Sequence, residues 1–167
     1  MKRLLLLATL VALAFPAPAK AQIVIVNDNG GRIERYLNHY NLLRDSNKRV
    51  MILGDCISSC TLLLAVVPRE RICAGSRARL GFHAPYNFDK FGQVITSRFW
   101  TQAMWELYPD DVRKVVTKRG GLSRKMIFLQ GRVLYALIPH CTPQPDVEVR
   151  PALVQPPERA MVHAQKR

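Results

Sequence analysis

Acidic residues are scarce in this chain. Its 167 residues include 12 Asp and Glu against 25 Lys and Arg, which gives a formal net charge of +13. A charge of this sign favours contact with anionic partners. Specific nucleic-acid binding is not expected, because the sequence has neither a helix-turn-helix signature nor an RNA motif with interleaved aromatics. We therefore expect a basic surface that meets an anionic component of the cell envelope.

Apolar runs of membrane-spanning length are also lacking, which excludes a multi-span membrane protein. The run from Leu4 to Phe15 has about 12 residues, whereas a spanning helix needs about 20. Lys2 and Arg3 precede it and an A-x-A site ending at Ala21 follows, as in a secretory signal peptide. We expect residues 1–21 to be removed and the mature protein, with a net charge of +10, to be periplasmic or secreted. The alternative is an uncleaved N-terminal anchor.

The remaining composition indicates one folded domain. Hydrophobic residues make up 49% of the chain and charged residues 22%, which excludes wholesale disorder. Residues 142–167 contain five prolines and no apolar period, so we expect a disordered tail outside the core. The expected folding unit is residues 22–141.

The chain has four cysteines but no C-x-x-C pair, and no histidine lies at ligand spacing beside Cys56 and Cys60, so no metal site is expected. In an exported protein an even number of cysteines favours disulfides, for which three connectivities exist. We expect Cys56 to pair with Cys60 around a tight loop, and Cys73 with Cys141. The alternative is that one or more pairs remain reduced thiols.

Apolar patterning predicts an α/β domain with a mainly parallel sheet. Glycine and proline positions set most of the expected boundaries. The expected strands are 23–26, 49–53 (ended by Gly54), 71–73 and 79–83; the expected helices are 32–46, 58–66, 94–108, one opened by Pro109, and short ones within 123–137; residues 84–92 are expected to be a polar loop.

Ser58 stands where a buried strand gives way to an apolar helix. A serine displayed there lies next to backbone N–H groups that can stabilise an oxyanion. The arrangement follows the logic of a nucleophile elbow, although the G-x-S-x-G pattern is absent. The alternative is that Ser58 only caps its helix, since serine is a favoured cap.

His83 is the candidate base for that serine. It ends a strand 25 residues further on, in the run Arg79-Leu-Gly-Phe-His83-Ala-Pro. A histidine at a strand end can reach the end of a neighbouring strand. The Gly30-Gly31 turn after the first strand can bring a second backbone N–H close to a substrate.

Taken together, these residues resemble the Clp protease proteolytic subunit within the wider Clp/crotonase fold. The resemblance covers roughly residues 23–85 and rests on the Gly-Gly turn, on Gly54 four residues before Ser58, and on the strand-end histidine. It implies a β-β-α superhelix, here truncated at the N-terminus, and a tendency to form homo-oligomers. It also implies that Ser58 is the nucleophile, His83 the base, and the N–H groups of Gly31 and Ser59 the oxyanion hole.

The sequence departs from this family at the third member of the catalytic triad. The acid would fall in residues 125–129, which contain no carboxylate, and Asp110 or Asp111 is the candidate substitute. The elements that dock an ATPase are not expected either, so the activity would be independent of ATP.

Two functions follow from these observations. The first is an exported serine peptidase or acyl hydrolase acting on a peptide or ester without a cofactor. The second is a non-catalytic Clp-like scaffold for binding or assembly at the cell envelope.

Overall fold

A computed structural model describes residues 22–142 as an α/β fold built on a mixed sheet. Hydrogen bonds connect the strands in the order β1 (Gln22–Asp28), β2 (Arg49–Ile57), β4 (Arg79–Phe82) and β7 (Ile127–Gln130). β1 and β4 run parallel to β2, and β7 runs antiparallel to β4. The short β3 (Ile72–Ala74) also pairs in parallel with β2, ahead of β4 along the same edge. The predicted α/β class and mainly parallel sheet are confirmed.

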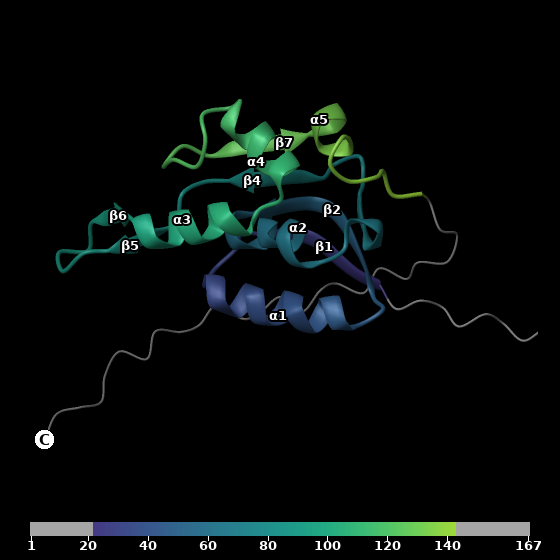
Figure 1. The fold of residues 1–167 in the computed structure, drawn as a ribbon, viewed down its shortest axis with the longest axis horizontal. Helices are drawn as coiled ribbons and strands as arrows, with labels where there is room; N and C mark the ends of the chain where they lie inside the picture. The colour runs from purple at the N-terminus through teal and green to yellow at the C-terminus, as the bar shows by residue number, and fades with distance from the viewer. Residues whose placement is uncertain (1–21, 143–167) are drawn as a thin grey trace, which may run out of the picture.

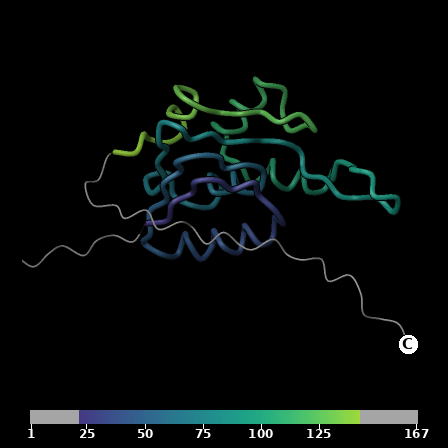
Figure 2. The backbone as a smooth tube through the Cα atoms, turned by 180° about the vertical axis from the view of Figure 1, so that it is seen from behind, coloured from purple at the N-terminus to yellow at the C-terminus, as the bar shows by residue number. Residues whose placement is uncertain are grey.

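The helices gather on one side of this sheet (Figures 1 and 2). They bury Tyr40, Leu63, Met104 and Val112 against sheet residues such as Ile52. The helical segments in chain order are α1 (Ile33–Asp45), the 3₁₀ turn η1 (Ser58–Leu62), α2 (Leu63–Val66), the 3₁₀ turn η2 (Arg69–Arg71), α3 (Arg98–Leu107), α4 (Asp110–Thr117) and α5 (Gly131–Tyr135).

Both predicted disulfides are formed. Cys56 bonds to Cys60 across the turn that leaves β2. Cys73 bonds to Cys141 and fastens the end of the domain to β3, where Cys141 N–H also donates to Ala74 O at 2.9 Å. Such a cross-link between distant segments stabilises the fold mainly by restricting the unfolded chain.

Gly54 does not end its strand, contrary to the prediction. The register of β1 on β2 shifts between Ile25 and Asn27, so that β2 carries one extra residue there. A Cβ atom at Gly54 would lie 1.8 Å from Val26 O. The glycine is present because the neighbouring backbone leaves no room for a side chain, and the strand continues to Ile57.

Two further predictions were wrong. The residues expected to form a polar loop (84–92) and to begin a long helix (94–108) instead contain a hairpin of β5 (Tyr86–Phe88) and β6 (Val94–Thr96). The helix α3 begins only at Arg98, and Ser97 caps it, because Ser97 Oγ accepts from Trp100 N–H at 3.3 Å. Within 123–137, β7 replaces part of the expected helices because its alternating burial completes the sheet beside β4.

The predicted signal peptide, residues 1–21, and most of the predicted tail, residues 143–167, lie outside the described residues. Within residues 22–142 no helix is both long and apolar enough to cross a membrane.

Replacing Gly54 with alanine tests the bulge. We expect Gly54→Ala to lower the free energy of unfolding by about 3 kcal/mol or more, since backbone atoms that cannot move away face the new methyl group. Urea denaturation followed by circular dichroism measures the change. Gly120→Ala is the control, because a Cβ atom there meets no neighbour and only its positive φ is unfavourable. Equal losses in the two variants would contradict the explanation.

Candidate functional site

Ser58 occupies a strained turn at the carboxyl end of β2. Its φ of 58° makes it the only residue other than glycine with a positive φ among residues 22–142. A left-handed serine is unfavourable by about 1–2 kcal/mol and persists only where the surroundings fix it. Residues held in strained backbone conformations cluster at active sites and ligand clamps.

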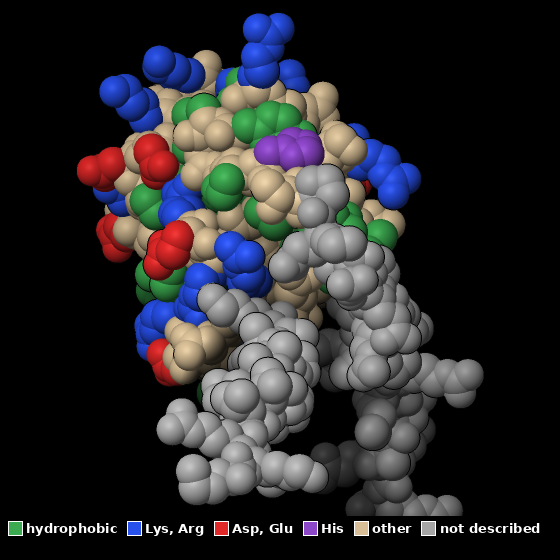
Figure 3. Space-filling view, turned by 90° about the vertical axis from the view of Figure 1, so that its right-hand side faces the viewer, with side chains coloured by type: hydrophobic (Ala, Val, Ile, Leu, Met, Phe, Trp, Pro, Cys, Tyr) green, Lys and Arg blue, Asp and Glu red, His purple; other side chains and the backbone are tan. Residues whose placement is uncertain are grey.

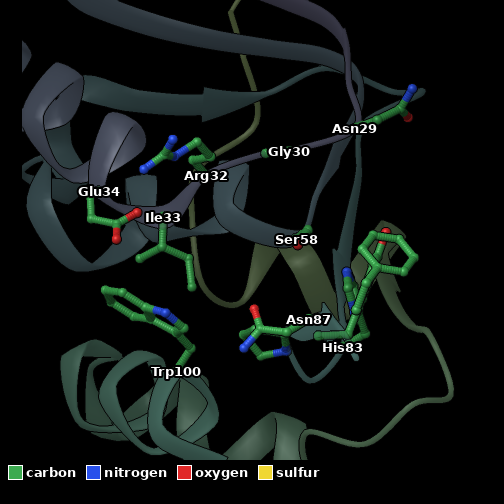
Figure 4. Close-up of a pocket in the computed structure, with 13 residues that line it drawn as sticks. Asn29, Gly30, Arg32, Ile33, Glu34, Ser58, His83, Asn87 and Trp100 are labelled. Carbon is green, nitrogen blue, oxygen red and sulfur yellow. The ribbon is translucent and has the colours of Figure 1, made fainter. Parts of the chain in front are cut away.

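The alternative role of Ser58, as a helix cap only, is not what the structure has. Ile57 is the residue before the 3₁₀ turn, and no side-chain bond caps that turn. Among the described hydrogen bonds, none involves Ser58 Oγ. The hydroxyl instead faces a cleft (Figure 4).

A buried hydrogen-bond chain holds the backbone of the turn. Thr61 Oγ1 donates to Ser58 O at 2.6 Å and therefore accepts from Tyr108 Oη, also at 2.6 Å. Tyr40 Oη donates to Cys60 O at 3.0 Å. Burial raises the pKa of Tyr108 and of Tyr40 well above the ordinary value, so both phenols remain protonated donors.

The Gly30-Gly31 segment packs directly on this turn. A Cβ atom at Gly30, whose φ is +79°, would lie 2.7 Å from Ser58 Cβ. Gly31 N–H donates to Ser59 Oγ at 2.7 Å, and that hydroxyl donates back to Gly31 O at 2.9 Å. The predicted oxyanion donor at Gly31 is thus adjacent to the nucleophile candidate, but its N–H group is bonded to Ser59 in this structure.

His83 follows β4 and lines the same cleft as Ser58 (Figure 4). Its Nδ1 lies 2.8 Å from Ala84 O. A carbonyl only accepts, so Nδ1 carries the proton in this contact, and in the neutral imidazole the lone pair is then on Nε2. That is the tautomer a general base requires. No described hydrogen bond joins His83 to Ser58.

The aspartates predicted as substitute acids lie elsewhere. Asp110 pairs with Arg113, and Asp111 accepts from Arg69 at 3.2 Å and from Val112 N–H at 2.8 Å. Neither bonds to His83 in the part of the chain that the structure describes. Within residues 22–142 the Ala84 carbonyl, and no carboxylate, contacts Nδ1 of His83, so the predicted role of Asp110 or Asp111 as the acid is wrong.

The cleft between these groups has a volume of about 620 Å³. Ile33 and Trp100 face each other across one part of it, and Asn87 lies near His83 (Figure 4). Neither Trp100, which also packs against the core, nor the Ala84 carbonyl was among the site residues predicted from the sequence. The described residues contain no cluster of His, Cys, Asp or Glu that could hold a metal ion.

Comparisons with known proteins bear on the fold alone. No protein-family model and no curated protein matches the sequence. Among solved structures, one described as the crystal structure of an enzyme is similar, with a TM-score of 0.50 and 11% sequence identity over 75% of this chain and 79% of that chain. A likeness at this identity concerns the fold alone, and it agrees with the α/β class.

The strain at Ser58 has a measurable consequence. We expect Ser58→Gly to raise the free energy of unfolding by about 0.5–1 kcal/mol, because glycine adopts a positive φ without a Cβ clash. Ser58→Ala, which keeps the Cβ atom, gives no such gain. Urea denaturation of both variants measures the difference. A loss of stability on Ser58→Gly, as at an ordinary position, would argue against the strain.

Proposed function

We propose that this chain is an exported serine hydrolase of the peptidase or acyl-hydrolase class, with a Clp/crotonase-like fold. The observation that carries the proposal is the strained, unbonded Ser58 in a cleft shared with His83, whose Nδ1 is engaged by a carbonyl. Strain and a fixed tautomer are features of a prepared nucleophile and base.

In the proposed reaction Ser58 Oγ attacks the carbonyl carbon of a peptide or ester while His83 Nε2 takes the hydroxyl proton. The tetrahedral intermediate collapses as the carbon–leaving-group bond breaks, and His83 returns the proton to the leaving group. Water then hydrolyses the acyl-enzyme by the same steps, with Nε2 as base. No cofactor and no ATP take part.

Oxyanion stabilisation would come from the backbone N–H groups of Ser59 and Gly31. The Gly31 N–H must first exchange its bond with Ser59 Oγ for the bond to the oxyanion. Ser59 is fully buried, so its hydroxyl keeps its other bond, to Gly31 O, during such an exchange. A substrate carbonyl would thus compete with the Ser59 hydroxyl for one donor.

A second candidate is the non-catalytic Clp-like scaffold. It is favoured by the missing hydrogen bond between Ser58 and His83 and by the absence of a carboxylate on the imidazole in the described structure. Removal of the acid from a catalytic triad lowers kcat about 10⁴-fold, and a protein that serves only as a scaffold does not need that activity.

A fluorophosphonate probe distinguishes the two candidates, because an activated serine displaces its fluoride whatever the natural substrate. With the oxidised protein we expect an adduct on Ser58, located by mass spectrometry. Ser58→Ala removes the adduct, and His83→Gln slows labelling about 10²-fold or more by removing the base. The control His39→Gln replaces an exposed histidine on α1 and labels at the normal rate. A folded, oxidised protein that remains unlabelled would support the scaffold instead.

A further inference from the structure

Exposed apolar side chains are concentrated in one segment. Of the ten large hydrophobic residues that are exposed in residues 22–142, six lie between Tyr86 and Phe99. Phe91 is 75% exposed and Phe99 72%. The six are Tyr86, Phe88, Phe91, Val94, Ile95 and Phe99. Exposed apolar patches of this kind mark interaction surfaces.

The β5–β6 hairpin carries most of them and extends beyond the body of the molecule (Figures 1 and 2). Each of its strands has three residues, and all six are exposed. A two-stranded hairpin is marginally stable in water on its own, so this one gains stability when its apolar side chains are covered. At its tip, Asp89 accepts from the N–H groups of Phe91 and Gln93, both at 2.8 Å.

A cationic loop lies at the same end of the molecule. Residues 118–125 contain Lys118, Arg119, Arg124 and Lys125 and no acidic residue. All four are exposed, and none forms an ion pair among the described residues. The loop precedes β7, and its Ser123 O accepts from Ala84 N–H at 2.7 Å, next to the base of the hairpin.

The opposite end of the molecule differs in charge pattern. It lies at the amino ends of the parallel strands, and Figure 3 shows acidic and basic side chains interspersed on it. The cleft opens among residues at the carboxyl ends of β1, β2 and β4, where the hairpin also begins. The apolar hairpin, the cationic loop and the cleft therefore lie at the same end of the molecule.

We propose that this end docks on an anionic lipid bilayer. The aromatic and aliphatic side chains of the hairpin enter the headgroup and acyl boundary, and the cationic loop contacts lipid phosphates. Cations beside exposed apolar groups are the combination that binds such interfaces. A second copy of this chain fits the surface less well. Residues 84–99 and 118–125 together contain one acidic residue, Asp89, against six basic ones, so a symmetric contact would bring two positively charged surfaces together.

Vesicle co-sedimentation tests the apolar contribution. We expect the oxidised chain 22–167, which lacks the apolar N-terminal run, to bind vesicles of phosphatidylglycerol and phosphatidylcholine but not of phosphatidylcholine alone. Phe91→Ser with Ile95→Ser should raise the lipid concentration for half-binding about tenfold. The control Leu42→Ser removes an equally exposed side chain on α1 and leaves binding unchanged.

The charge contribution is tested in the same assay. Neutralising Lys118, Arg119 and Lys125 with glutamine should weaken binding about tenfold or more, and 0.5 M salt should do likewise. The control neutralises Lys48, Arg77 and Arg132, which are exposed at the opposite end. Equal losses in both triple variants would show a non-specific effect of net charge and overturn the proposal.

Other outcomes are equally decisive. Absence of vesicle binding overturns the proposal. Sedimentation velocity gives a second test: if the protein forms an oligomer that the double substitution Phe91→Ser, Ile95→Ser dissociates, a second copy covers the hairpin and the proposal is overturned. Binding to an acidic polysaccharide that survives the hairpin substitutions, without vesicle binding, assigns the cationic loop to glycans instead. Ser58→Ala should bind vesicles normally, so docking and hydrolysis can fail separately.

Discussion

The site depends on one backbone conformation, the left-handed turn at Ser58. Three constraints hold it: the Cys56–Cys60 disulfide ties its ends, Thr61 binds the Ser58 carbonyl, and Gly30 packs where any side chain would collide. Without them the serine would relax to negative φ, which is lower in energy. Because the turn also ends β2, its position determines where the hydroxyl stands relative to the neighbouring strand end at His83.

A carbonyl in place of a carboxylate changes what His83 can do in the proposed reaction. The Ala84 oxygen fixes the Nδ1 tautomer as an aspartate would, and Pro85 restricts the backbone that presents it. It carries no full charge, so it stabilises the imidazolium less once Nε2 has taken the serine proton. A slower proton transfer follows, and esters, whose leaving groups need less help than amines, are the better substrates.

Local sequence signals were sufficient where local chemistry decides the structure. The Cys56–Cys60 disulfide was predicted from its tight spacing and is formed. Ser58 and His83 were predicted to stand at neighbouring strand ends, and both line one cleft. The prediction that Gly54 ends its strand was wrong because glycine usually interrupts a strand. Only the close contact with Val26, which is distant in sequence, explains why a glycine stands there. The hairpin was missed because its strands have no buried face, so the alternation that reveals a strand is absent.

The compartment of the protein, the proposed reaction and the proposed docking surface are physically connected. The disulfide that helps to hold Ser58 is of the kind that persists in an oxidising compartment, so the strained turn is compatible with an exported protein. A net positive charge suits a compartment bounded by anionic lipid. If the cleft faces the bilayer, an acyl group or peptide held at the membrane can reach Ser58 without leaving the membrane. Attachment of the protein to the membrane then raises the effective concentration of such a substrate at the cleft. Attachment of the protein to the membrane would therefore partly compensate for the slower hydrolysis that follows from the lack of a carboxylate beside His83.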